Sequence, residues 1–174
     1  MLTSTLLALA ALGILIYSMP WLRSPRSHGF FRFFAFESIL ALVALHVDHW
    51  FRDPFSAHQI VSWLLLIASA ALAIHGFHLL HAVGKPRGDF EATTHLVRVG
   101  AYRYIRHPLY ASLLWLAWGV FFKLPNLPGG ALALAATGFL YATARVEERE
   151  NLRKFGTEYL DYMDETKMFV PFVF

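Results

Sequence analysis

The sequence predicts an all-α integral membrane protein with five transmembrane helices, followed by an amphipathic helix on the cytoplasmic side. Of its 174 residues, 57% are hydrophobic and 16% are charged, whereas a soluble domain has about 45–50% apolar and about 25% charged residues. The apolar residues are grouped, and a group of about 20 with few charges is long enough to cross the hydrocarbon layer as a helix. We therefore expect one membrane domain covering residues 1–174.

Five apolar segments follow one another along the chain, at residues 2–19, 33–50, 60–81, 109–122 and 130–144. The first has no charge and no basic start, so we expect it to be a retained span and not a signal peptide. The fourth and fifth are short, and the Pro and Gly residues between them predict a short helical hairpin. Residues 1–83 would hold three spans, and residues 84–174 the connector, the hairpin and the C-terminal helix.

The basic residues predict how the chain is oriented in the membrane. If the N-terminus lies outside, all of the 15 Lys and Arg residues except Arg52 and Lys123 fall on one side, with Arg87 among them. The positive-inside rule assigns that side to the cytoplasm. An even number of spans would destroy this partition, which favours five.

Residues 147–163 are polar, yet Leu152, Phe155, Tyr159 and Tyr162 or Met163 recur in them at helical spacing. This pattern predicts an amphipathic helix that lies on the cytoplasmic surface or against the bundle. The apolar tail, residues 168–174, is expected to enter the interface or to close the mouth of a site. The chain has no cysteine, which excludes disulfides, thiolate metal sites and a cysteine nucleophile.

Histidines and one acid inside the apolar segments raise the question of a further site. One histidine group lies at residues 75–81 and another at residues 46–58, and a bilayer core of about 30 Å would separate them, so they cannot form one binuclear centre. The group at 75–81 is interpreted as interfacial, as the lining of a polar cavity or as a metal site, and no metal site is predicted. Glu37 is expected either to snorkel towards Arg32 or to contact a ligand.

The connector between the third and fourth spans, residues 93–107, is dense in cations, aromatic rings and hydroxyl groups. Pro108 fits the first turn of the next helix, whose free backbone N–H groups lie beside Arg106 and His107. Together these groups form a receptor for a carboxylate or phosphate of a ligand. Anionic lipid headgroups would fit the same patch, and the sequence leaves both interpretations open.

Two motifs stand about forty residues apart: VGAYRYIRHPLYAS at residues 99–112 and RVEERENLRKFGTEYLDYM at residues 145–163. In this order they resemble the isoprenylcysteine carboxyl methyltransferase and phospholipid methyltransferase superfamily. The resemblance covers about half of the chain. It departs from the family pattern at Ala101, where many relatives have proline, and at Ser112, where glycine is frequent.

The resemblance implies a methyltransferase with a helical pocket that is open to the cytoplasm and binds S-adenosylmethionine, giving S-adenosylhomocysteine as product. Arg145 is then the candidate contact to a substrate carboxylate. If the acceptor is an amine, a base must accept a proton, and His95, His107 or a histidine of the third span is the candidate. The cofactor contacts carried over from the family are Thr94, His95, Leu96, Val97, Tyr102, His107, Pro108, Tyr110, Glu147 and Glu148.

The side-chain chemistry agrees with this interpretation. Glu147 or Glu148 can accept hydrogen bonds from the ribose hydroxyls or the ammonium group of the cofactor, although both acids would also suit a solvated helix start. The predicted partners are membrane lipid and a lipophilic small-molecule or prenylated substrate, with no nucleic acid, and carboxyl methylation of an isoprenylcysteine-like acceptor is preferred. The alternatives are N-methylation of a phospholipid or another amine, a non-catalytic lipid-binding scaffold and a metal-dependent oxidoreductase.

Overall fold

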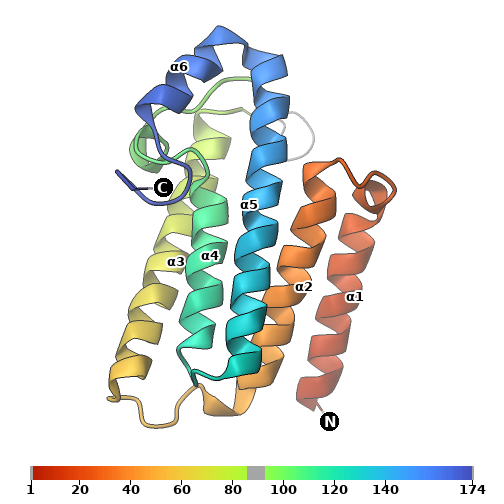
Figure 1. Ribbon diagram of the computed structural model, residues 1–174, viewed down its shortest axis with the longest axis vertical. Helices are drawn as coiled ribbons and strands as arrows, with labels where there is room; N and C mark the ends of the chain where they lie inside the picture. Colours follow the sequence, from red (N-terminus) through yellow and green to blue (C-terminus); the bar gives the residue numbers. More distant parts are fainter. Residues whose placement is uncertain (1, 86–92, 174) are drawn as a thin grey trace. The chain divides into compact units, whose positions relative to one another are not determined.

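The computed structural model describes residues 2–85 and 93–173, and its regular secondary structure over these residues is helical (Figure 1). Four described helices are long and apolar enough to cross a membrane, which agrees with a multi-pass membrane protein. They are α1 (Leu2–Leu22), α2 (His28–His46, continued by the 3-10 turn Val47–His49), α3 (Ala57–Ala82) and α5 (Leu127–Phe155). The shorter apolar helix is α4 (Pro108–Phe121), and α6 (Thr157–Glu165) follows α5. Arg87 and Phe174, which entered the sequence predictions, lie outside the described residues.

The contacts within the chain divide it into two compact units. The first unit consists of Met1–Leu66 and Leu114–Val146, and the second of Ile67–Leu113 and Glu147–Phe174. Helices α3, α4 and α5 therefore each contribute residues to both units.

In the first unit, α1 packs along α2 (Figure 1). Helix α2 begins at His28, five residues before the predicted start of the second span. The Ser27 side chain caps it by accepting a hydrogen bond from the Phe30 amide. The charge that suggested a later start belongs to Arg32, which is buried with its guanidinium carbon 5.3 Å from the ring centroid of Tyr17 and 5.1 Å from that of Trp21. Aromatic faces offset part of the cost of burying this cation.

The histidines near residues 46–58 support the turn between α4 and α5, also in the first unit. His46 Nε2 lies 2.9 Å from the Leu124 carbonyl oxygen, and His58 Nδ1 lies 3.0 Å from that of Phe122. Lys123 in this turn is buried, and its ammonium group lies 3.4 Å from the ring centroid of Trp63. These contacts give His46 and His58 a structural role.

The prediction of a short fifth helix was wrong, because α5 has 29 residues. The Asn126 side chain accepts a hydrogen bond from the Gly129 amide at its start, so Pro128 lies inside the first turn and not in the preceding loop. Residues 147–155, predicted to begin a separate amphipathic helix, continue α5. The break comes at Gly156, whose φ of 60° is readily reached by glycine, and α6 forms the remainder of the predicted amphipathic segment.

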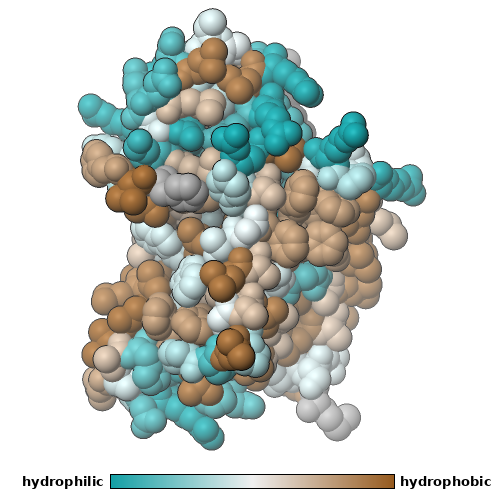
Figure 2. Space-filling view, viewed as in Figure 1, coloured by the Kyte–Doolittle hydropathy of each residue, from teal (hydrophilic) through white to brown (hydrophobic). Residues whose placement is uncertain are grey.

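The second unit joins the end of α3, the connector, the start of α4, the last turns of α5, and α6. Figure 2 shows hydrophilic residues gathered over α6 and the adjoining end of α5. The tail is buried at Met168 and Phe169 and exposed at Phe172 and Val173.

Candidate functional site

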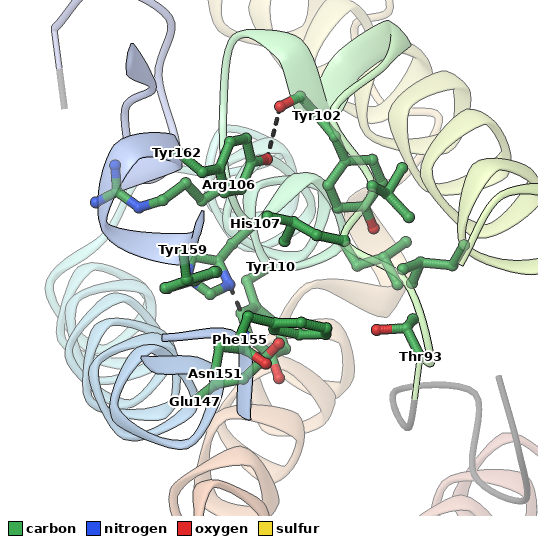
Figure 3. A pocket seen from close by; sticks show the side chains of 14 residues that line it. Thr93, Tyr102, Arg106, His107, Tyr110, Glu147, Asn151, Phe155, Tyr159 and Tyr162 are labelled. Carbon is green, nitrogen blue, oxygen red and sulfur yellow. Dashed lines mark hydrogen bonds and ion pairs between the residues drawn. The ribbon is translucent and has the colours of Figure 1, made fainter. Parts of the chain in front are cut away.

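A pocket of about 600 Å³, including its open mouth, lies in the second unit. Figure 3 shows side chains from the connector, α5 and α6 directed around one space. The lining residues are Leu80, Thr93, Leu96, Val97, Tyr102, Arg106, His107, Leu109, Tyr110, Glu147, Asn151, Phe155, Tyr159 and Tyr162.

The path of the connector depends on a close approach to α3. Gly100 has a φ of 58°, and a Cβ atom at this position would lie 2.6 Å from His75 Nε2. The same His75 nitrogen accepts a hydrogen bond of 3.3 Å from the Ala101 amide. The 3-10 turn Gly100–Arg103 that starts here carries Tyr102 into the pocket wall.

His107 is held by rings on two sides. Its imidazole stacks at 5.5 Å on Tyr110, one turn into α4, and lies 6.2 Å from the ring of Phe169 in the tail. Its Nδ1 lies 3.9 Å from a Glu147 carboxylate oxygen, which is the pair joined by a dashed line in Figure 3. Its Nε2 is buried and lies 3.6 Å from a Glu148 carboxylate oxygen, which is longer than a normal hydrogen bond. Both ring nitrogens therefore lie near carboxylates of α5, and a ligand in the pocket would meet the rings of His107 and Tyr110.

The two consecutive acids of α5 have different surroundings. Glu148 is buried and receives a 2.8 Å hydrogen bond from Arg106 Nε, so the two charges compensate each other. Glu147 lines the pocket, and 24% of its side chain remains exposed. The Arg106–Glu148 pair neutralises the cation of the lining, which leaves Glu147 as the acid that a cationic ligand group would meet.

Two tyrosines of α6 supply buried hydroxyl groups. The Tyr162 hydroxyl donates a 2.6 Å hydrogen bond to the Tyr102 carbonyl oxygen, which fastens α6 to the connector. Burial raises the pKa of both Tyr159 and Tyr162 above the ordinary tyrosine value. Both phenols therefore stay neutral, as hydrogen-bonding groups, over the physiological pH range.

The structure brings together one part of the predicted cofactor set. The members that line the pocket are Leu96, Val97, Tyr102, His107, Tyr110 and Glu147. The members outside the lining are Thr94, His95, Pro108 and Glu148.

These four residues support the lining or the connector. Thr94 donates a hydrogen bond to the Lys85 carbonyl oxygen and lies 2.9 Å from His95 Nδ1. Pro108 is fully buried at the start of α4, and Glu148 holds Arg106. The catalytic candidate Arg145 is exposed on α5 within the first unit, and it is not one of the lining residues.

The lining also includes residues that the sequence analysis did not select as contacts. Leu80 comes from α3, and Asn151, Phe155, Tyr159 and Tyr162 come from α5 and α6. Phe155 and the two tyrosines belonged to the apolar stripe of the predicted amphipathic helix, and this stripe was the available signal. The spacing of these residues predicts that they share one face of a helix, but it does not show that this face lines the pocket.

Two histidines of α3, His75 and His81, have backbone partners in the second unit. His75 binds the Ala101 amide, and His81 Nδ1 lies 3.3 Å from the Phe77 carbonyl oxygen. Within residues 2–85 and 93–173, no group of three or more His, Cys, Asp or Glu side chains is placed to hold a metal ion.

Comparison with known proteins identifies relatives that act as methyltransferases. A family model described as phospholipid methyltransferase matches residues 57–158. The methanethiol S-methyltransferase of Mycobacterium tuberculosis is 28% identical over 159 residues, covering 76% of this chain and 61% of the relative.

Two further relatives carry the name protein-S-isoprenylcysteine O-methyltransferase. Form A from Arabidopsis thaliana is 30% identical over 128 residues, covering 72% of this chain and 62% of the relative. The Mus musculus protein is 31% identical over 108 residues, covering 62% and 37%. The chain thus spans less than two thirds of the length of each of these three relatives.

Proposed function

Because the chain belongs to the phospholipid methyltransferase family, we propose that it is an S-adenosylmethionine-dependent methyltransferase whose cofactor binds in the pocket of the second unit. The observation that carries the proposal is that Glu147 and His107 line one pocket together with hydroxyl and aromatic groups of the connector and α6. The matched region runs from α3 into α6 and so includes most of the lining.

The lining residues fit this cofactor. Its sulfonium and ammonium groups are cations, and Glu147 is a partly exposed carboxylate beside a compensated Arg106–Glu148 pair. Its adenine needs flat apolar surface, which Tyr102, Phe155 and neighbouring leucines provide.

When bound, S-adenosylmethionine supplies an activated methyl group, so the protein contributes mainly positioning and exclusion of water. Glu147 would accept hydrogen bonds from an ammonium group or from ribose hydroxyls. The stacked His107 and Tyr110 rings would hold a planar or thioether group against α4. The neutral Tyr159 and Tyr162 would keep the inner wall uncharged.

For the acceptor we propose a lipophilic molecule that enters from the bilayer, with the carboxylate of an isoprenylcysteine-like compound preferred. Two of the relatives are named for that substrate. Such a carboxylate needs no base, because it is already ionised at neutral pH. A thiol acceptor is the second candidate, since the methanethiol S-methyltransferase match covers 76% of this chain. A thiol has to lose a proton, and His107, whose ring nitrogens lie 3.9 Å from Glu147 and 3.6 Å from Glu148, is the group of the lining that could take it.

Calorimetric titration of the detergent-solubilised full chain with S-adenosylhomocysteine tests the cofactor site. We expect saturable binding that Glu147→Gln weakens about tenfold, the effect of about 1.4 kcal/mol from one charged contact. Glu158→Gln is the matched control, because Glu158 is an exposed acid of α6 outside the pocket lining. A well-folded parent that binds neither S-adenosylhomocysteine nor S-adenosylmethionine would refute the cofactor assignment and favour a lipid-binding scaffold.

Methyl transfer from labelled cofactor then identifies the acceptor. Farnesylated cysteine, a small alkyl thiol and phosphatidylethanolamine represent the carboxylate, thiol and amine classes. We expect label in the farnesylated cysteine as a base-labile ester. Label found only in a thioether or a methylated amine would overturn the preferred acceptor.

We also propose that α4 is a fifth span, that the N-terminus is outside and that the pocket opens to the cytoplasm. The asymmetric placement of Lys and Arg supports this orientation. Because the chain has no cysteine, single cysteines at Arg52 and Arg103 can be labelled with an impermeant maleimide without background. Labelling of intact cells at position 52 and not at 103 is expected, and the reverse pattern would refute the orientation.

A further inference from the structure

Arg106 lines the pocket, but Nε and Nη1 of its guanidinium group donate hydrogen bonds to acceptors within the protein. Nε donates a 2.8 Å hydrogen bond to Glu148, and Nη1 donates to the carbonyl oxygens of Met163, at 3.2 Å, and Thr166. Figure 3 shows the end of this side chain directed away from the space between His107 and Glu147. The acceptors come from α5 and from the end of α6, so one side chain joins both to the connector.

The backbone repeats this connection. The Arg106 amide donates to the Lys167 carbonyl oxygen at 2.7 Å, and the His107 amide donates to that of Met168 at 3.2 Å. In return the Lys167 amide donates to the Tyr104 carbonyl oxygen at 3.1 Å. Residues 163–169, here the C-terminal segment, are therefore bound to the connector by main-chain and side-chain hydrogen bonds.

The C-terminal segment contacts the site through the ring of Phe169, which lies near His107. Phe169, 1% exposed, lies with its ring centroid 6.2 Å from that of His107, whose ring also stacks on Tyr110. Met168, which is also buried, accepts the hydrogen bond from the His107 amide. The orientation of His107 thus depends on residues more than sixty positions later in the chain.

We infer that Arg106 is a positioning residue, not a contact to the cofactor carboxylate: it fastens the C-terminal segment onto the connector so that Phe169 fixes His107 in the pocket wall. The part of this inference that concerns the cofactor rests on the proposed function. The clasp itself, formed by Arg106, Glu148 and the C-terminal segment, is a property of the folded chain without ligand.

Two ligands separate positioning from direct contact. S-adenosylhomocysteine contains an amino-acid group, whereas 5′-methylthioadenosine has the same adenine, ribose and thioether without a carboxylate or an ammonium. If Arg106 positions the wall, Arg106→Gln weakens both ligands by the same factor, about tenfold, as expected when hydrogen bonds to a charged group are lost. Arg106→Lys should not restore binding, because one ammonium group cannot reproduce the fork of a guanidinium on acceptors in different directions.

Hydrogen exchange on the ligand-free full chain in detergent tests the clasp itself. Arg106→Gln should accelerate exchange of the amides of Arg106, His107 and Lys167, which bind across it. Arg103→Gln, the same substitution at an exposed position of the connector, should leave both exchange and binding unchanged. Phe169→Leu keeps the arginine and should weaken both ligands equally, so it serves if Arg106→Gln does not fold.

The outcomes are distinct. Equal weakening of both ligands with faster exchange supports the inference. Selective loss of S-adenosylhomocysteine binding in Arg106→Gln would make Arg106 a direct contact and overturn it, as would unchanged exchange. If the parent binds neither ligand, the proposed function fails, and the exchange comparison alone decides whether the clasp exists.

Discussion

Alanine substitutions at three glycines test the close approach between the connector and α3, with Gly100 in the connector and Gly156 and Gly138 as comparisons. At Gly100, φ is 58° and a new Cβ atom would lie 2.6 Å from both His75 Nε2 and Leu79 Cδ1. At Gly156, φ is 60° but nothing lies within 4 Å of the Cβ position. At Gly138, inside α5, φ lies outside the left-handed region and the Cβ position is open. The series separates backbone strain from steric overlap.

The expected changes in the free energy of unfolding follow from these three environments. Backbone strain from an alanine in the left-handed region destabilises the folded state by about 1–2 kcal/mol. The substitution also lowers the conformational entropy of the unfolded chain, which offsets about 0.4–1 kcal/mol of this loss. Gly156→Ala should therefore destabilise the protein by about 0.5–1 kcal/mol. Gly100→Ala should cost about 2–3 kcal/mol, because the overlap also breaks the 3.3 Å bond from the Ala101 amide to His75. Gly138→Ala should stabilise the helix by about 0.5–1 kcal/mol.

Thermal unfolding of the four proteins in one detergent, followed by circular dichroism, measures the order. At about 2–4 °C per kcal/mol for a chain of this size, Gly100→Ala should unfold about 5–10 °C below the parent. Gly156→Ala should lie slightly below the parent and Gly138→Ala slightly above it. If Gly100→Ala is no less stable than Gly156→Ala, the close approach between the connector and α3 is wrong.

Two further predictions concern buried polar groups. Because burial raises the pKa of Tyr159 and Tyr162, their contribution to stability is complete below about pH 10 and falls as the pH rises above it, where the unfolded chain loses the protons first. Tyr159→Phe and Tyr162→Phe should therefore leave the tyrosinate absorbance of the folded protein near pH 10.5 almost unchanged, and a clear loss of that absorbance would contradict the burial. Ser62 donates a 2.7 Å hydrogen bond to the Gly119 carbonyl oxygen on another helix, so Ser62→Ala should cost about 0.6 kcal/mol in equilibrium unfolding. Ser38→Ala, which removes a bond within its own helix, should cost less, and equal losses would argue against the contact between the helices.

The sequence predicted the spans well where polarity and helix length coincide. Helix α1 is an uninterrupted apolar segment, and α3 matches its predicted span to within three residues at the N-terminal end. Prediction was wrong where a charge lies inside a helix. Arg32 suggested a boundary but is buried against aromatic rings. The acids of α5 suggested a new helix, although no Gly or Pro lies between Gly138 and Gly156. The end of a helix depends on backbone geometry, and the polarity of the residues is only an indirect guide to it.

Residues of the candidate site could be selected from the sequence where several charged and aromatic residues lie close together. The connector and Glu147 contain unusual combinations of cation, ring and acid, and the structure places several of them in one pocket. The sequence suggested that the apolar tail enters the interface or closes the mouth of a site, but it did not predict the specific contact of Phe169 with His107. This contact joins residues 62 positions apart and depends on a few hydrogen bonds between the connector and the C-terminal segment.

The adjacent acids Glu147 and Glu148 have different roles because they point in different directions from α5. Neighbouring residues on a helix point about 100° apart, so Glu148 can face Arg106 while Glu147 faces the pocket. Had both acids faced the pocket, they would repel each other and leave Arg106 without compensation. With Arg106 compensated by Glu148, the pocket favours a cationic ligand group at Glu147, and an anionic group would have to be held by neutral donors such as Thr93, Asn151 and the tyrosine hydroxyls. This balance suits a ligand that carries a sulfonium and an ammonium better than an anionic lipid headgroup.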